Sequence, residues 1–150
     1  MLSEPLRVEY LKDAPLFPEQ QRTAAQQAGI NFEKAAARKL AQLYVKVVSG
    51  PWLRYHSPKK WGICQPDVLV WLTPQHLLVI EVKLSWMPQV RQKLLTLYGP
   101  LIQKLHPEAT LSYLQLYKNW KPKAHKKPLS IYALDDIKQG AYKECQFLGL

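Results

Sequence analysis

Two apolar runs separated by a short polar interruption dominate the middle of the chain. The runs, Val68–Leu72 and Leu77–Val82, are rich in β-branched residues, and Thr73-Pro74-Gln75 lies between them. Runs of this kind around a short proline-containing segment predict a β-hairpin. With the turn centred on Pro74, positions equally distant from that proline are expected to face each other.

The two faces of this predicted hairpin differ in polarity. Side chains of a strand alternate between faces, and the even-numbered positions of both runs are all apolar. The odd-numbered face is apolar except at one end, where Asp67 is expected across from Glu81 and Lys83 follows two residues later. Two carboxylates and an ammonium at the end of a buried sheet are unfavourable unless something binds them. The pattern therefore predicts a functional site.

The residue types at this end of the hairpin suit a divalent cation. Two carboxylates one strand spacing apart match Mg²⁺, which takes one or two carboxylates together with waters and substrate phosphate. A lysine two residues beyond Glu81 can orient or deprotonate a metal-bound water, or neutralise charge that develops on a phosphate. A purely structural ion pair is the alternative interpretation of the same residues.

Pro66-Asp67, thirteen intervening residues and then Glu81-Val82-Lys83 resemble the motif of the PD-(D/E)xK nuclease superfamily. The resemblance implies a metal-dependent phosphodiesterase that acts on nucleic acid. It also implies that Asp67, Glu81 and the main chain of Val82 bind Mg²⁺ or Mn²⁺, and that Lys83 serves the attacking water.

A helix is predicted before the hairpin, from Glu19 to Leu43. Pro18 suits its start, and an apolar stripe recurs at helical spacing toward its end. Gly29 interrupts the alanine-rich run and predicts a break or a close helix contact.

Glu33 lies beside the apolar stripe of this helix and has two interpretations. Gly29-x-x-Phe32-Glu33 resembles the helix of the same superfamily whose glutamate reaches the metal, which makes Glu33 a candidate ligand. Alternatively, Glu33 is a solvated helix residue that pairs with Lys34 or Arg38. A metal ligand on this helix requires that the helix cross near Asp67.

The segment between helix and hairpin carries the first candidate nucleic-acid contacts. Ser49-Gly50-Pro51 predicts a turn, and residues 52–56 predict an edge strand that contains Arg54. Residues 57–62 predict a loop. In this loop Lys59 and Lys60 can hold phosphate, and Trp61 can stack on a base. An exposed turn with a packed tryptophan is the alternative.

After the hairpin the period changes to that of a helix. Ser85 is a candidate N-cap, an apolar stripe begins at Val90, and Gly99-Pro100 predicts a break or kink. Gln92 and Tyr98 have the wrong spacing for the Gln-x-x-x-Tyr motif of exonucleases in the superfamily. Leu111–Tyr117 alternates and predicts a strand, which the helical crossover places parallel to its neighbour.

A basic run follows from residue 118 to residue 127, with five lysines and no acid. Its prolines and its lack of periodicity predict a loop that grips the nucleic-acid backbone, with a solvated charge run as the alternative. The candidate contacts are Lys118, Lys121, Lys123, Lys126 and Lys127. Residues 129–134 predict a last strand.

Length and charge agree with this interpretation. A chain of 150 residues forms one domain with a single core, and a formal net charge of +10 favours a polyanionic partner such as DNA. No apolar run is long enough to span a membrane, which predicts a cytoplasmic protein, or one of the host cytoplasm if a phage encodes it. Residues 1–18 predict an extended arm that can wrap a partner subunit.

Together these patterns predict an α/β domain with a mixed central β-sheet and flanking helices. Its order, αβββαβ over about residues 19–118, matches the restriction endonuclease-like core of the superfamily. The predicted function is that of a Mg²⁺-dependent or Mn²⁺-dependent DNA endonuclease, structure-selective or junction-resolving, which works as a homodimer. RNA is the other substrate that the patterns allow. The alternative is a nucleic-acid-binding protein of the same fold without turnover.

Overall fold

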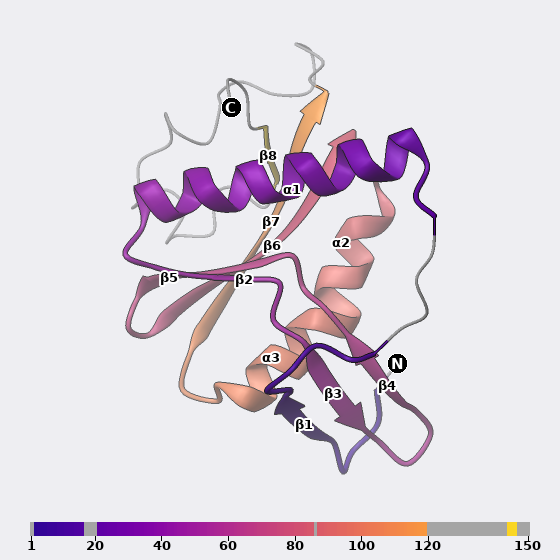
Figure 1. Cartoon of the computed structure of the whole chain (residues 1–150). Helices are drawn as coiled ribbons and strands as arrows, with labels where there is room; N and C mark the ends of the chain where they lie inside the picture. The colour runs from indigo at the N-terminus through magenta and orange to yellow at the C-terminus, as the bar shows by residue number, and fades with distance from the viewer. Residues whose placement is uncertain (1, 17–20, 86, 120–143, 147–150) are drawn as a thin grey trace.

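The computed structural model of the chain describes residues 2–16, 21–85, 87–119 and 144–146. Its mixed α/β architecture has two sheets and flanking helices (Figure 1). The elements in chain order are β1 (Arg7–Tyr10), α1 (Ala24–Leu43), β2 (Lys46–Ser49), β3 (Leu53–His56), β4 (Trp61–Cys64), β5 (Val68–Thr73), β6 (His76–Ser85), α2 (Gln89–Lys93), the π-helical turn η1 (Leu94–Tyr98), α3 (Gly99–Leu105), β7 (Thr110–Asn119) and β8 (Glu144–Gln146).

The larger sheet is mixed and has the strand order β2-β5-β6-β7-β8. Strands β2, β5 and β6 are antiparallel neighbours, whereas β7 runs parallel to β6 and β8 parallel to β7. Strands β5 and β6 are joined by a short turn, whereas the parallel pair needs the helical crossover through α2 and α3. The predicted parallel strand after the helix is therefore confirmed.

The predicted hairpin is formed by β5 and β6, with the expected register. Val68 pairs with Ile80 and Trp71 with Leu77, so positions equally distant from Pro74 do face each other. The register shifts between Trp71 and Thr73, where Thr73 pairs with His76. This irregularity lies at the turn, so it leaves the pairing at the Asp67 end unchanged.

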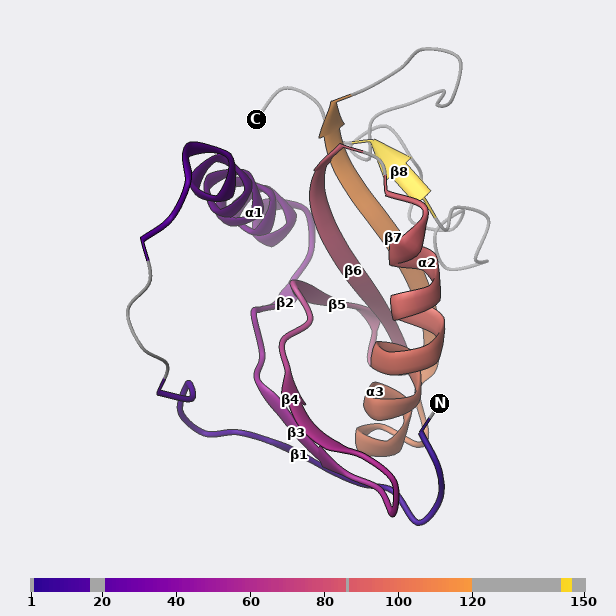
Figure 2. The ribbon, with the colours of Figure 1, turned by 90° about the vertical axis from the view of Figure 1, so that its right-hand side faces the viewer.

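Helix α1 covers the even-numbered face of the hairpin (Figure 2). Phe32, Ala36 and Leu40 pack with the even positions of β5 and β6 in one core cluster. The helix begins after Thr23, whose hydroxyl accepts a hydrogen bond from the Gln26 amide in a capping box. Neither alternative predicted for Gly29 holds. The helix runs through this residue, because a glycine in a long helix costs only about 1 kcal/mol, and a Cβ atom there would have no atom within 4 Å.

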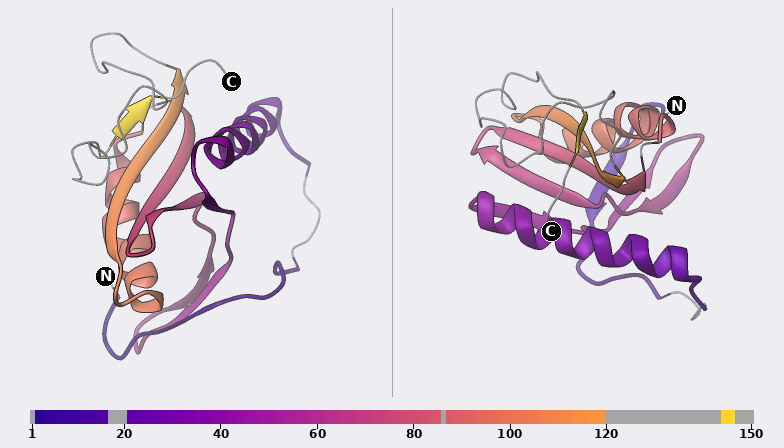
Figure 3. Two further views of the ribbon diagram at one scale, coloured as in Figure 1. Left: turned by 90° about the vertical axis from the view of Figure 1, so that its left-hand side faces the viewer. Right: turned by 90° about the horizontal axis from the view of Figure 1, so that it is seen from above.

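The odd-numbered face packs against the helices on the opposite side (Figure 3). Leu69, Leu77 and Val79 contact an apolar stripe on α2, η1 and α3 that starts at Val90. Ser85 does not cap this helix, since it is the last residue of β6 and the cap position belongs to Pro88. At Gly99-Pro100 the helix continues, and the irregularity is the π-helical turn immediately before it.

The smaller sheet has the order β1-β3-β4 and corrects three sequence-based predictions. Strand β3 was predicted as an edge strand, yet it lies in the centre, with β1 and β4 on either side. Trp61 and Gly62 were predicted in a loop, yet they belong to β4. Residues 7–10 of the predicted arm pair within their own chain, because Leu6 and Val8 join the core beneath this sheet.

Several predictions fall wholly or partly outside the described residues. These are the basic loop beyond Asn119, which contains Lys121, Lys123, Lys126 and Lys127, and the strand predicted over residues 129–134. Lys118 is described, and it is an exposed residue of β7. Among the described residues, no helix is both long and apolar enough to cross a membrane.

Candidate functional site

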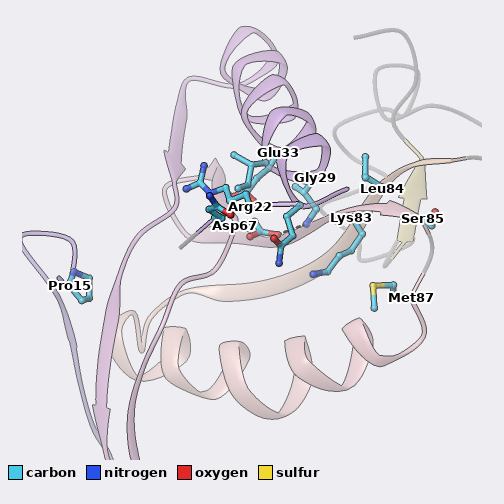
Figure 4. A pocket seen from close by; sticks show the side chains of 13 residues that line it. Pro15, Arg22, Gly29, Glu33, Asp67, Lys83, Leu84, Ser85 and Met87 are labelled. Atoms are coloured by element: carbon cyan, nitrogen blue, oxygen red, sulfur yellow. Dashed lines mark hydrogen bonds between the residues drawn. The ribbon is translucent and has the colours of Figure 1, made fainter. Parts of the chain in front are cut away.

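A hollow of about 1170 Å³ lies where α1 passes the Asp67 end of the hairpin (Figure 4). Glu33 reaches it from α1, Asp67 from the start of β5, and Lys83 from the end of β6. Its full lining is Pro15, Gln21, Arg22, Gln26, Gly29, Ile30, Glu33, Asp67, Val82, Lys83, Leu84, Ser85 and Met87. The helix therefore crosses near Asp67, as a role for Glu33 requires.

The Asp67 side chain is held by the neighbouring strand. The Val82 amide donates a hydrogen bond of 2.7 Å to Asp67 Oδ2, which extends the pairing of β5 and β6 by one side-chain contact. On the other side, the Gly50 amide donates to the Asp67 carbonyl oxygen at 2.8 Å. One carboxylate oxygen and the main chain of Asp67 are thus fixed by backbone groups, which leaves little freedom for the side chain.

The turn at Gly50 and the residues before Asp67 brace each other. Gly50 has φ of 57°, and a Cβ atom there would lie 2.8 Å from Gln65 Nε2, so both conformation and space favour glycine. Gln65 Nε2 donates to the Gly50 carbonyl oxygen at 2.8 Å, and the Tyr98 hydroxyl donates to the Gln65 carbonyl oxygen at 3.2 Å. Contacts from η1 and from the turn therefore position the aspartate.

Crowding and burial disfavour the charged form of Asp67. Burial, the hydrogen bond and charge of Glu81 and the charge of Glu33 raise the pKa of Asp67 to about 9, although the hydrogen bond from Val82 acts in the opposite direction. Burial and the neighbouring acids therefore favour the protonated form of the Asp67 carboxyl when no cation is near. A bound cation would favour its carboxylate form.

Glu33 belongs to the same group of acids. Burial and the charge of Glu81 raise its pKa, whereas Lys83, a hydrogen bond with Asp67 and the charge of Lys34 lower it. An isolated solvated glutamate would not respond to three groups on the hairpin. Glu33 therefore lies at the hollow with Asp67 and Lys83, while the charge of Lys34 also acts on it.

Glu81 is the most deeply buried acid of the group, with only 1% of its surface exposed. It does not line the hollow. Instead, its Oε2 atom lies 3.0 Å from Nζ of Lys93 on α2, and the Lys93 ammonium lies 4.9 Å from the centroid of the Tyr98 ring. Burial opposes the charge of Lys93, but hydrogen bonds and charges from Tyr98 and Glu81 outweigh it and raise the pKa of Lys93.

Lys83 is half-buried and lies two residues beyond Glu81 on β6. Figure 4 shows its side chain extending into the hollow, beneath α1 and toward the side occupied by α2. Among the described residues it forms no ion pair, whereas Lys93 does. The two lysines thus differ in their surroundings. Lys93 neutralises the buried Glu81, whereas the Lys83 ammonium lies at the hollow, where it can contact a bound ligand.

The chemistry of these donors fits a hard divalent cation in part. Glu33 and Asp67 provide carboxylate oxygens at the hollow, and burial, followed by the charges of neighbouring acids, raises the pKa of both. However, no three His, Cys, Asp or Glu side chains within the described ranges are arranged to hold a metal ion. Glu81 can serve a cation shared with Asp67 only in competition with Lys93.

The predicted nucleic-acid contacts lie on two separate surfaces. Arg54 and Trp61 are exposed on the smaller sheet, and Lys59 and Lys60 lie in the turn between β3 and β4. Lys118 is exposed near the C-terminal end of β7, next to Tyr117, which pairs with Lys83, and its Nζ lies 5.9 Å from the Phe32 ring centroid. The remaining four lysines of the basic run lie outside the described residues.

Two basic residues of the site were not predicted from the sequence. Lys93 lies next to the apolar stripe of α2, where a lysine can equally extend its ammonium into solvent. Its pairing with Glu81 joins two elements whose contact the local sequence pattern does not specify, so no signal in the sequence pointed to it. Arg22 lines the hollow ahead of α1, and no sequence pattern distinguishes it.

No protein-family model, no curated protein and no solved structure matches the chain that builds this site.

Proposed function

We propose that the protein is a metal-dependent deoxyribonuclease of the PD-(D/E)xK type, which hydrolyses phosphodiester bonds at the hollow between α1 and the hairpin. The observation that carries the proposal is the meeting of Glu33, Asp67 and Lys83 at one hollow, from three different elements. The two carboxyls have raised pKa values, which is the state expected of acidic groups that await a cation.

The arrangement of elements also supports a restriction endonuclease-like core. Helix α1 is followed by three antiparallel strands of the larger sheet, β2, β5 and β6, then by the helices that begin at α2, and then by the parallel strand β7. This order is αβββαβ, with β3 and β4 as an insertion before the second strand. The strand before the hairpin in this order is β2, whereas the sequence pattern predicted residues 52–56 as that strand.

Each residue of the site has a distinct proposed role. Asp67 and Glu33, with Glu81 and the Val82 main chain behind them, would hold Mg²⁺ or Mn²⁺, which supplies charge stabilisation for the phosphate and a more acidic water. Lys83 orients the attacking water or neutralises charge on the phosphate oxygens. Lys93 compensates the Glu81 carboxylate in its buried position. Cleavage as a homodimer, with one site for each strand, is part of the proposal.

A nucleic-acid-binding protein without turnover is the second candidate. The formal net charge of +10 supports it as well as it supports a nuclease. The crowded carboxyls favour the enzyme, because acidic groups at the hollow would repel a phosphate backbone unless a cation intervened.

A cleavage assay tests the proposal and separates the two candidates. Purified protein is incubated with supercoiled plasmid and with branched DNA, in Mg²⁺, in Mn²⁺ or in EDTA. A nuclease converts the DNA only with the metal ion, and Asp67→Asn loses the activity while its thermal unfolding remains cooperative. Binding without conversion of either DNA in the presence of metal would overturn the proposed enzyme and leave the binding protein.

A further inference from the structure

The smaller sheet has one covered face and one open face. Its covered face carries Leu53 and Tyr55 against α2 and α3 (Figures 2 and 3). On this face the Tyr55 side chain lies directly over Gly62, and a Cβ atom at residue 62 would lie 2.7 Å from the tyrosine hydroxyl oxygen. Residues that pair across an antiparallel sheet point to the same side. The residues of this sheet that do not share the side of Leu53 and Tyr55 therefore form the open face.

Two rows of side chains form this open face. In the first row Arg7 pairs with His56 and His56 with Trp61; in the second, Glu9 pairs with Arg54 and Arg54 with Ile63. All six residues are exposed. A groove of about 610 Å³ runs along β1 and β3 beside them. An open sheet face is normally polar throughout, so the tryptophan and the isoleucine on this one stand out.

Trp61 is the most unusual residue of this face. It is 71% exposed at the start of β4, and no aromatic or cation–π contact involves it among the described residues. A large apolar side chain gains roughly 1.5–3 kcal/mol from burial in a core, which this one forgoes. Aromatic rings that stand free beside basic residues are the platform on which unpaired bases stack.

Basic side chains surround Trp61. Arg7 and His56 share its row, and Lys59 and Lys60 lie in the turn just before it. None of these four forms an ion pair within the described part of the chain. Arg54 differs, because Glu9 holds its guanidinium in an ion pair on the same face. Most of the basic side chains are thus free to contact phosphate.

The open face is also close to the site in sequence. Trp61 and Asp67 are six residues apart, and an extended chain covers at most about 3.6 Å per residue, so their Cα atoms lie within about 22 Å of each other. That separation is no more than the length of a few nucleotides of single strand.

We infer that this face of the β1-β3-β4 sheet is a platform for single-stranded DNA, on which Trp61 stacks a base while Arg7, Lys59 and Lys60 hold the phosphates. The inference rests on the proposed function for its DNA substrate, and it names the substrate class: DNA with an unpaired segment next to the scissile bond. Duplex DNA offers no free base to Trp61, since its bases stack on one another.

Binding in EDTA tests the platform without involving cleavage. Fluorescence anisotropy of a labelled oligothymidylate and of a blunt duplex of equal length is measured for the wild type and for four variants. Trp61→Ala should weaken binding of the single strand by about 10-fold, because base–aromatic stacking contributes on the order of 1–3 kcal/mol. Trp61→Phe should retain most of the affinity, and Leu95→Ala, at an exposed apolar position of η1 outside this sheet, should leave it unchanged.

The fourth variant, Glu9→Gln, should bind the single strand more tightly than the wild type. It removes the one acid of the two rows and releases Arg54, so the slope of log K against log[salt] should be about 0.7 steeper. The inference is overturned if Trp61→Ala binds the oligothymidylate like the wild type, or if duplex and single strand lose affinity equally. Single-strand binding that depends on Trp61, without any cleavage in Mg²⁺, would support the platform and reject the nuclease.

Discussion

Lys93 Nζ on α2 lies 3.0 Å from Oε2 of Glu81 in the middle of the larger sheet. The carboxylate is almost completely buried, whereas 42% of the lysine side chain is exposed. The pair links the helix that follows the hairpin to the acid that the sequence motif singles out. It also explains how the sheet tolerates a glutamate at a buried position, since an unpaired buried charge is strongly unfavourable.

Removal of Lys93 should destabilise the protein. Lys93→Ala leaves Glu81 buried without its partner, which costs about 3–5 kcal/mol for a fully buried pair and roughly 1–3 kcal/mol here, because water reaches the exposed part of the lysine site. Urea unfolding of Lys93→Ala, Glu81→Gln and the double variant measures the coupling between them. The double variant should recover part of the loss.

Lys104 provides the matched control for this measurement. Its Nζ lies 3.7 Å from Glu4, and both side chains are largely exposed. Lys104→Ala should therefore change the free energy of unfolding by no more than about 0.5 kcal/mol. Equal effects at Lys93 and Lys104 would contradict the structural role of the buried pair.

The raised pKa of Asp67 predicts a pH dependence of stability. Its value is about 9 in the folded protein against 3.8 when exposed, so between these values the folded state binds more protons than the unfolded state. Stability from this residue is therefore fully present below about pH 4 and is lost as the pH rises toward 9, by at most about 1.4 kcal/mol per pH unit.

Asp67→Asn isolates this contribution, because the amide oxygen can still accept the hydrogen bond from Val82. Urea unfolding in EDTA at pH 5, 7 and 9 should show a shallower fall for this variant than for the wild type. Asp13→Asn, at an exposed position, is the control and should follow the wild type. Parallel pH profiles for wild type and Asp67→Asn would show that Asp67 does not carry a proton in the folded protein.

Lys83 should be required for cleavage but not for folding. Lys83→Ala removes the free ammonium from the hollow, and a positioned acid–base group contributes about 10²–10⁴-fold to a rate. Lys83→Arg keeps the charge but places its donors differently, so it should recover only part of the rate. Single-turnover cleavage with Mg²⁺ measures both variants.

Lys46→Ala is the control for Lys83, because Lys46 is exposed on β2 and lies 5.2 Å from the Trp71 ring, away from the hollow. It should cleave at the wild-type rate. Unfolding of Lys83→Ala, in place of lost activity, would assign Lys83 to a structural ion pair.

The basic run after β7 should govern the salt dependence of DNA binding. Changing Lys121, Lys123, Lys126 and Lys127 to Ala removes up to four lysine–phosphate interactions, each of which releases condensed counterions. The slope of log K against log[salt] for duplex DNA should shrink by about 0.9 for every phosphate that the variant no longer neutralises. Binding is titrated with salt in Ca²⁺, and an unchanged slope would show that the run is solvated.

The sequence by itself determined the centre of this protein. Alternation of apolar residues around Pro74 is a local property, and it predicted the hairpin, its register and the apolar faces that α1 and α2 cover. The same alternation placed Asp67 near Glu81. The period of the apolar residues and the length of the turn suffice for these features, because two strands joined by a short turn pair with each other.

Only the tertiary structure decided which acid faces which cation. Glu33 meets Asp67 because α1 crosses the sheet at one angle among several that its apolar stripe permits. Glu81 turned out to pair with Lys93, on a helix that contacts the sheet only after the crossover is complete. Likewise, residues 53–56 alternate as an edge strand would, and β1 covers their edge from a distant part of the chain. Such contacts join residues far apart in sequence, so the local pattern that sets each element carries no information about them.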